Sequence, residues 1–476
     1  MKPGRTNIRY ETMKAPELKA VALFIAVLAG FLTPFDLSAV TIALPSIGSE
    51  FSMDAVALSW VSTAYLLAAG VFLVPFGRIA DIHGRKKVFL AGLSLFIISS
   101  FLMVLSRSAP MVIILRVLQG SGAALIFGTS VAILTELTPV TERGRALGIY
   151  TTAVYLGLSL GPFIGGFLTT AFGWRSIFLV NVPVGIGAIL LILSFLRGEW
   201  ADAKGERFDL GGAVQYGLAL VCVMYGFSLL PDRDGLILIV AGSVMLLVFI
   251  ARELRIGYPL LSMTLFKKNH VFAFSGLAAL INYAATFSIA FFLSLYLQYV
   301  RGFSADTAGT ILVVQPVFQA VFSSWAGRLS DRIEPGKIAS AGMAILAAGL
   351  FALSMLGEDT GIPFLIVTLA VIGFGFALFS SPNTNAIMSS VEKKYLGIAS
   401  GTLGTMRLVG QMLSMGIATM IIAVYVGRVE ITPLEHGQLM MAMRAGFTLF
   451  TGLSIAGIFF SLKRGRLRGD GLPEGD

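Results

Sequence analysis

Cysteine, histidine and charged residues are all scarce in this chain of 476 residues. The single cysteine, Cys222, excludes internal disulfides and cysteine-based metal sites, and we assign no ligand role to the three histidines. Charged residues make up 13% of the chain, about half of the roughly 25% found in soluble domains. Because 56% of the residues are hydrophobic, polar groups cannot cover the surface. We therefore expect lipid to surround the protein, and we expect no metal and no cofactor.

Long apolar runs separated by short polar turns follow one another from end to end. Most approach or exceed the ~20 residues that a helix needs to cross a bilayer. The pattern predicts an all-α membrane protein with fourteen transmembrane helices. We place these helices at 20–46, 57–78, 88–106, 109–135, 145–171, 176–196, 209–230, 235–251, 271–299, 305–327, 338–356, 361–389, 397–426 and 440–462.

The distribution of lysine and arginine gives a topology. If the N-terminus is cytoplasmic, 27 of the 35 basic residues fall on inner segments and six on outer segments, while Arg116 and Arg407 lie within helices. Basic residues concentrate on the cytoplasmic side of membrane proteins. We therefore expect both termini in the cytoplasm, and we attribute the net charge of +9 to topology and not to nucleic-acid binding.

Two short segments recur along the chain. The sequence at 77–81 is echoed at 327–331, an offset of 250 residues, and the sequence at 143–148 is echoed at 396–401, an offset of 253. Near-equal offsets predict two homologous six-helix halves with an insertion between them. The expected division is a cytoplasmic tail at 1–19, a first bundle at 20–197, a linker with two extra transmembrane helices at 198–270, a second bundle at 271–463 and a cytoplasmic tail at 464–476.

The segment 77–90 reads GRIADIHGRKKVFL and forms a tight basic turn after the second predicted helix. Gly77 begins the segment, Gly84 permits the bend, and Arg85 holds it on the cytoplasmic side. We expect Asp81 to accept hydrogen bonds from free backbone N–H groups at the start of the next helix. Asp331 occupies the corresponding position of the second half.

The fifth predicted helix carries glycines at a regular spacing. Gly157, Gly161 and Gly165 recur every four residues and form a smooth face that another helix can approach closely. Pro162 removes a backbone donor and bends the helix. An ordinary packing face of small residues is the alternative interpretation.

These segments resemble the major facilitator superfamily. The turn at 77–90 resembles its signature loop, and the fifth helix is similar to its antiporter signature, G-x8-G-x3-GP-x2-GG. The segment 116–122 resembles its R-x-x-Q-G-x-G motif. The segments 36–45 and 174–185 resemble the fourteen-helix drug:proton antiporters of that superfamily, with Ser38 where threonine is usual. The resemblance implies two six-helix bundles around a central cavity, two inserted helices, and proton-driven export of small amphipathic compounds by alternating access.

Two opposite charges lie inside the first half. Asp36 and Arg116 are both expected roughly 10–14 Å below the outer boundary. A charge in hydrocarbon costs at least ~2.5–3.5 kcal/mol, so both side chains should face the protein interior or a wet cavity. Our hypothesis is that Asp36 carries the proton, that Arg116 modulates it, and that Glu136 is an inner exit. A structural pair and an interfacial acid are the respective alternatives.

Polar and aromatic side chains within the apolar helices are candidates for a substrate cavity. Some of them will instead hydrogen-bond between helices or pack in the core. We find no acid deep in the last six helices, which favours neutral, monocationic or anionic amphipathic substrates. The candidates are Gln119, Asn282, Tyr283, Phe287, Gln315, Gln319, Asn383, Arg407 and Gln411.

Three other function classes compete with export. A proton-coupled uptake or metabolite transporter would share the fold, and the glycine–proline pattern of the fifth helix argues against it. A non-transporting membrane sensor should have lost the buried charges. A membrane enzyme would need a metal cluster, a nucleophile motif or a nucleotide-binding loop, and none has the required spacing. We expect a monomer in the plasma membrane whose partners are lipid, protons and a small molecule.

Overall fold

The protein is a bundle of membrane-length helices. The computed structural model describes residues 15–139, 142–196, 198–257, 260, 266–267, 269–392 and 396–465. Within these residues fourteen helical spans are long and apolar enough to cross a membrane, which confirms the predicted number. Of the predicted tails at 1–19 and 464–476, residues 1–14 and 466–476 lie outside the described residues.

Helices dominate because a backbone in lipid must satisfy its own hydrogen bonds. Three of the described α-helices in addition begin with a side chain that accepts a bond from a free N–H group. Asp54 accepts from Ala57 N at 2.8 Å, Asp209 accepts from Gly212 N at 3.0 Å, and Asn269 accepts from Phe272 N at 2.9 Å.

The first six helices pack closely together. The helix α1 packs along α5, α2 and α3 pack on α4, and α6 packs on α3. Their bounds are α1 (Ala15–Phe51), α2 (Ala55–His83), α3 (Arg85–Val104), α4 (Ala109–Leu137), α5 (Arg143–Phe172) and α6 (Arg175–Phe195).

The last six spans form a second bundle, in which two spans are interrupted. The ninth consists of α10 (His270–Thr286), α11 (Ile289–Leu295) and a π-helical turn, η1 (Tyr296–Val300), and the tenth consists of α12 (Ala305–Leu312) and α13 (Val314–Arg332). The sequence predicted one continuous helix for each. The remaining elements are α14 (Pro335–Ser354), α15 (Ile362–Ser389), α16 (Leu396–Tyr425), the short 3-10 helix η3 (Pro433–Glu435) and α17 (His436–Lys463).

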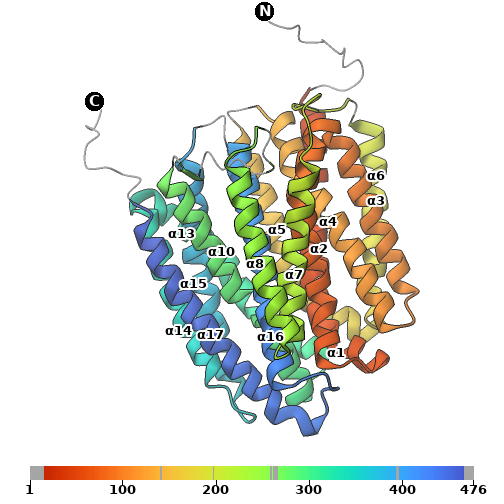
Figure 1. Ribbon diagram of the computed structural model, residues 1–476, viewed down its shortest axis with the longest axis vertical. Coiled ribbons are helices and arrows are strands. Elements are labelled where there is room, and N and C mark those ends of the chain that lie inside the picture. The colour runs from red at the N-terminus through yellow and green to blue at the C-terminus, as the bar shows by residue number, and fades with distance from the viewer. Residues whose placement is uncertain are drawn as a thin grey trace, which may run out of the picture.

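Two further helices separate the bundles in the sequence. They are α7 (Leu210–Leu229) and α8 (Arg233–Glu253), which pack against each other. Figure 1 shows them in front of the two bundles, and α7 contacts both α2 and α16. The Tyr216 hydroxyl donates to the Gly70 carbonyl at 3.1 Å, while Met224 lies against Gly416. The inserted pair therefore touches both halves, and the predicted domain limits at 197 and 271 stay a prediction.

The two ends of the bundle differ in charge. We call the end at which α1 begins and α17 ends the basic end (Figure 1). The side chains of Arg78, Arg85, Lys86 and Arg143 lie there. The opposite end, which we call the far end, contains Glu50 in an ion pair at 2.6 Å with Arg175.

Glycines bring α5 very close to its neighbours. A Cβ at Gly157 would lie 2.4 Å from the Phe31 carbonyl oxygen, and one at Gly165 would lie 2.8 Å from Ala39 Cα. The glycine face therefore packs on α1 of the same half. The other half is reached one position later, where a Cβ at Gly166 would lie 2.4 Å from the Ala305 carbonyl oxygen.

The middle of the same helix shows both contacts. A Cβ at Gly161 would overlap Ser38 Oγ of α1. A Cβ at Gly309 of α12 would overlap the Pro162 carbonyl oxygen of α5. The predicted close-packing face exists, and α5 holds α1 while it touches the second half.

Candidate functional site

Asp36 of α1 and Arg116 of α4 form an ion pair inside the first half. Arg116 Nη1 lies 2.6 Å from Asp36 Oδ2, and both side chains have 0% exposure. The two residues, which were predicted to lie at the same depth in the membrane, are thus in direct contact. Among the described acids, only Asp36 is buried far from both ends of a membrane helix; the buried Glu253 is the last residue of α8.

Polar side chains from three more positions complete this network. Gln119 Nε2 donates to Asp36 Oδ1 at 3.0 Å and to Ser100 Oγ at 2.8 Å, while Asn181 Nδ2 donates to Asp36 Oδ1 at 2.6 Å. Arg116 Nη1 also donates to Gln119 Oε1 at 2.6 Å. All three partners of the carboxylate are donors, an arrangement that suits its ionised, acceptor-only form.

Two buried atoms of the network lack a partner among the described residues. They are Arg116 Nη2, a donor, and Asn181 Oδ1, an acceptor. Buried polar atoms are nearly always hydrogen-bonded, so such exceptions call for an explanation. The network has room for a second arrangement of its hydrogen bonds.

Tyr65 of α2 lies between this network and the cavity described below. The Arg116 guanidinium carbon is 4.3 Å from the centre of its ring, a cation–π contact. The Tyr65 hydroxyl donates to the Thr33 carbonyl at 3.3 Å, and Arg116 Nε donates to the Val61 carbonyl at 2.9 Å. Tyr65 lines the cavity whereas Asp36 and Arg116 do not, so the ion pair is closed off in this conformation.

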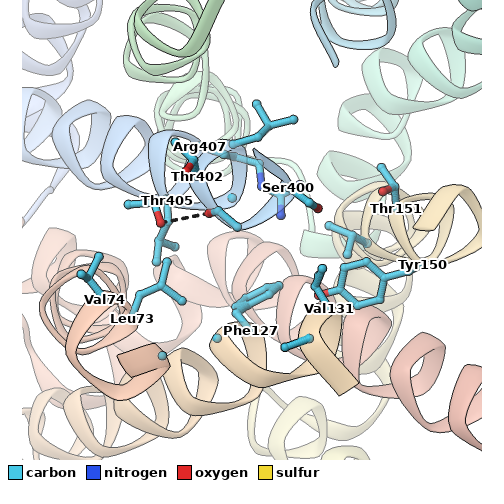
Figure 2. Close-up of a pocket in the computed structure, with 18 of the residues that line it drawn as sticks. Leu73, Val74, Phe127, Val131, Tyr150, Thr151, Ser400, Thr402, Thr405 and Arg407 are labelled. Carbon is cyan, nitrogen blue, oxygen red and sulfur yellow. Dashed lines mark hydrogen bonds between the residues drawn. The ribbon is translucent and has the colours of Figure 1, made fainter. Parts of the chain in front are cut away.

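A central cavity of about 760 Å³ lies between the two halves. Its wall includes residues near the basic end, such as Asp81, Glu136 and Arg143, and reaches inward to Tyr65 and Gln411. Figure 2 places Arg407 of α16 across the cavity from Phe127 and Val131 of α4. The volume and the mixed polar and apolar wall suit a drug-sized molecule.

The far end is closed by contacts between the halves. Ser294 Oγ donates to the Thr41 carbonyl at 3.0 Å, and Gln298 Nε2 donates to the Ile42 carbonyl at 2.9 Å. Thr170 Oγ1 donates to Asp306 Oδ1 at 3.1 Å. As far as the described residues show, the cavity therefore opens at the basic end and is closed at the far end.

Of the nine side chains predicted to line the cavity, Tyr283, Arg407 and Gln411 do so. Gln119 instead bonds to the buried carboxylate, and Asn383 Oδ1 accepts from Arg464 at 3.0 Å. Phe287, Gln315 and Gln319 lie outside the wall. Sequence polarity marks a helix face that avoids lipid, and such a face can equally meet another helix.

Asn282 is the most unusual of these departures. It is fully buried, does not line the cavity, and neither of its amide atoms has a partner among the described residues. We have no physical account of it.

Arg407 is surrounded by tyrosines. Tyr150, Tyr155 and Tyr283 lie near its guanidinium and line the same cavity. The Tyr155 and Tyr283 hydroxyls are 3.2 Å apart and join α5 of the first half to α10 of the second. Arg407 forms no ion pair with any residue that the structure describes. The three tyrosines were not sought as a group because they are distant in the sequence.

At the basic end, the turn after α2 is held by the segment that follows α6. Gly84 has φ of 120°, a conformation that favours glycine. Asp81 accepts from Arg85 Nε at 2.8 Å and does not cap α3, contrary to the prediction. Asp202 pairs with Arg85 at 2.8 Å.

Further contacts secure the same turn. Glu199 Oε1 accepts from the Lys86 backbone N–H at 2.8 Å, and Glu206 pairs with Arg78. Acids of the linker, which the sequence did not single out, thus bind this turn. At the corresponding position of the second half, Asn385 Nδ2 donates to Asp331 Oδ1 at 3.3 Å.

Two other charged groups lie near the basic end. Glu136 is exposed and lines the cavity, and its role as an exit for protons stays a prediction. Arg464, expected in a cytoplasmic tail, is buried and donates to Ser461 and Asn383. Burial lowers the pKa of Arg464 to about 10, so it keeps its charge near neutral pH.

The chain belongs to the Major Facilitator Superfamily, whose family model matches residues 26–278 and 275–473. Together with the fourteen membrane-length spans, this defines a multi-pass membrane transporter of small molecules, and not an enzyme. The fold is the one expected from the sequence, two six-helix bundles with two inserted helices.

Several curated relatives align over most of the chain. The cephamycin export protein CmcT of Amycolatopsis lactamdurans is 33% identical over 429 residues, which cover 87% of this chain and 86% of the relative. The riboflavin transporter RibZ of Clostridioides difficile is 29% identical, with 82% and 85% covered. The multidrug resistance protein Stp of Mycobacterium tuberculosis is 29% identical, with 83% and 74% covered.

Solved structures share the fold at lower identity. An inward-facing bacterial homologue of the lysosomal transporter Spinster matches with a TM-score of 0.66 and 16% identity, covering 95% of this chain and 97% of that one. The xylose transporter XylE of E. coli matches with a TM-score of 0.64 and 14% identity, covering 96% and 100%.

Proposed function

We propose that the protein is an antiporter of the plasma membrane that exports small amphipathic compounds in exchange for protons. The basic end would face the cytoplasm, with both termini, because basic residues concentrate on that side. The cavity would then be open to the cytoplasm, where an exported compound is collected. Export is the direction named for CmcT, and it agrees with the glycine–proline pattern of α5.

One observation carries the coupling mechanism: a carboxylate, Asp36, is enclosed within the membrane beside Arg116, and both have 0% exposure. Ionisable groups at membrane depth are functional by default because burying them is costly. Burial opposes the charged form of a carboxylate, whereas an opposite charge and donated hydrogen bonds favour it. With Arg116 at 2.6 Å, we take the present conformation to be the one in which Asp36 has given up its proton.

The complementary state requires the far end to open. Asp36 lies on α1, whose Thr41 and Ile42 carbonyls accept bonds from the second half at that end. Breaking these contacts would let α1 move relative to α4 and admit water from outside. A protonated Asp36 needs an acceptor, and the free Asn181 Oδ1 can serve as one. Arg116 would modulate the exchange by drawing the ionised carboxylate back.

The test compares Asp36→Asn with the wild type in proteoliposomes. Probes that share one aromatic body allow charge to be varied alone: naphthalene-2-sulfonate, naphthalene-2-sulfonamide and (2-naphthylmethyl)trimethylammonium. We expect an imposed pH gradient to drive at least one charged probe against its own concentration gradient in the wild type. Asp36→Asn should move the probe without dependence on the pH gradient. Asp232→Asn, the same change at an exposed acid, is the matched control. Flux of Asp36→Asn that still follows the gradient would refute the assignment.

A further inference from the structure

The deep part of the cavity contains one full charge among the described residues. Four described acids line the cavity: Asp81, Glu136, Asp202 and Glu206. Asp81 and Glu136 lie within two residues of the ends of α2 and α4, and the other two belong to the segment between α6 and α7. All four therefore line the mouth at the basic end. Asp81, Asp202 and Glu206 are already paired with arginines of that end.

Arg407 lies well inside this mouth. It comes 11 residues after the start of α16 at Leu396, or ~16 Å along the helix axis. Its side chain lines the cavity. An arginine near a helix end can extend its head group to the interface. Here, however, the groups near the guanidinium are tyrosine side chains that line the same cavity.

The neighbouring tyrosines do not neutralise the charge of Arg407. Tyr155 and Tyr283 approach the guanidinium, and a tyrosine hydroxyl is neutral at ordinary pH and can donate as well as accept. A charge at membrane depth normally has an opposite partner. Arg407 has none among the described residues. The cavity that Arg407 faces is the space from which a negative charge can reach it.

The surroundings indicate the rest of the molecule. Phe127, Val154, Leu158 and Leu408 line the cavity in its membrane-embedded part, so an apolar body can be accommodated there. Arginine suits planar or tetrahedral oxyanions because its N–H groups form a fixed fork. The two tyrosine hydroxyls would donate to the same group.

We propose that Arg407, Tyr155 and Tyr283 bind the oxyanion of an amphipathic monoanionic substrate, a carboxylate or sulfonate, whose apolar part packs on the wall. This proposal rests on the proposed export function, which it narrows to anionic compounds. The three residues would also join the two halves through the ligand, since α5 and α10 come from different halves. Occupancy of the site would thus be felt by both moving parts.

The test measures equilibrium binding of the three naphthalene probes to the full-length protein in detergent, with no pH gradient. We expect the wild type to bind the sulfonate more tightly than the sulfonamide and the trimethylammonium cation. Arg407→Gln should weaken sulfonate binding about ten- to a hundredfold, the value of a charged hydrogen bond. Its sulfonamide affinity should change little, which also shows that the variant is folded. Arg407→Lys should recover part of the sulfonate affinity.

Two results would overturn the proposal: tighter binding of the cation than of the sulfonate by the wild type, or an unchanged order of affinities in Arg407→Gln. Asp36→Asn separates this proposal from the coupling mechanism. If it keeps its response to the pH gradient while Arg407→Gln loses sulfonate selectivity, the proton assignment fails and the anion site stands. If Asp36→Asn loses the response while Arg407→Gln keeps its selectivity, the reverse holds.

Discussion

Two arginines within the membrane have opposite environments. Arg116 has its own carboxylate at 2.6 Å, a glutamine and a backbone carbonyl as partners, and 0% exposure. Arg407 faces the cavity, has neutral tyrosines near it, and forms no ion pair with any described residue. The charge of Arg116 is neutralised by a carboxylate of the protein, and the charge of Arg407 is not neutralised by any described residue.

This difference assigns the two arginines different work. Arg116 can act only on the state of Asp36, whereas Arg407 can act on a molecule that enters the cavity. Tyr65 lies between the two regions, since its ring covers Arg116 and also lines the cavity. Proton and substrate would then influence each other through the conformation of the bundles and not by sharing one site, which is a coupling between separate sites.

Replacing each arginine in turn should give the largest difference in unfolding free energy between the two sites. Arg116→Gln leaves the buried Asp36 without its counter-charge, which should cost about 3–5 kcal/mol of unfolding free energy. Arg407→Gln removes a charge that has no internal partner and should cost far less. Denaturant unfolding in detergent measures both. The double variant Asp36→Asn/Arg116→Gln should recover much of the loss, and equal losses in the two single variants would contradict the contrast.

Membrane potential sharpens the comparison through charge counting. With one proton entering on Asp36 and one monoanion leaving from Arg407, two positive charges move inward in each cycle. A neutral substrate would move one. The extra charge is worth about 2.3 kcal/mol per 100 mV. Accumulation of naphthalene-2-sulfonate in proteoliposomes clamped with potassium and valinomycin should therefore rise twice as steeply with potential as that of the sulfonamide. Accumulation of the sulfonate that ignores potential would show that charge is not separated in this way.

Tyr65 tests the barrier between the two regions. Tyr65→Ala removes a cation–π contact of about 0.5–2 kcal/mol and connects the cavity to the ion pair. We expect protons to leak through this variant without substrate, as a faster collapse of an imposed pH gradient in proteoliposomes. Tyr65→Phe keeps the ring and should leak little. If Tyr65→Ala does not leak protons, another group separates the ion pair of Asp36 and Arg116 from the cavity.

The smallest expected effect concerns the tyrosines at Arg407. Tyr155→Phe and Tyr283→Phe each remove one hydroxyl, worth about 0.5–1.5 kcal/mol in a hydrogen bond, or about two- to tenfold in sulfonate affinity. The exposed Tyr225→Phe is a matched control. If these variants weaken sulfonamide binding as much as sulfonate binding, the hydroxyls contribute to packing and not to recognition of the anion.

The sequence predicted the helices well because a span of apolar residues has one stable form in lipid. It missed the break at Phe287–Ser288, where α10 gives way to α11 and no proline lies. It also missed the break at Val313 between α12 and α13, although Pro316 lacks the N–H that would donate to the Leu312 carbonyl. Asp36 and Arg116 were found since charges within apolar runs are conspicuous.

The remaining partners depended on how the helices turn toward one another. Gln119, three residues after Arg116, points the same way and was within reach of helical periodicity. Ser100 and Asn181 lie on α3 and α6, and their meeting with α1 and α4 follows only from packing. The tyrosine group around Arg407 requires α5, α10 and α16 to be placed together, which no local pattern supplies.

Substrate-induced proton release tests the central claim most directly. Naphthalene-2-sulfonate is added to the purified protein in weakly buffered detergent, and the pH is followed. We expect the probe to favour the conformation with the cavity open to the basic end, in which Asp36 is ionised. Its binding should therefore draw molecules out of the protonated conformation with the far end open, and so release protons from the wild type. Arg407→Gln should need more probe for the same release, and Asp36→Asn should release none. Full release from Asp36→Asn, or none from the wild type while it binds the probe, would contradict the account.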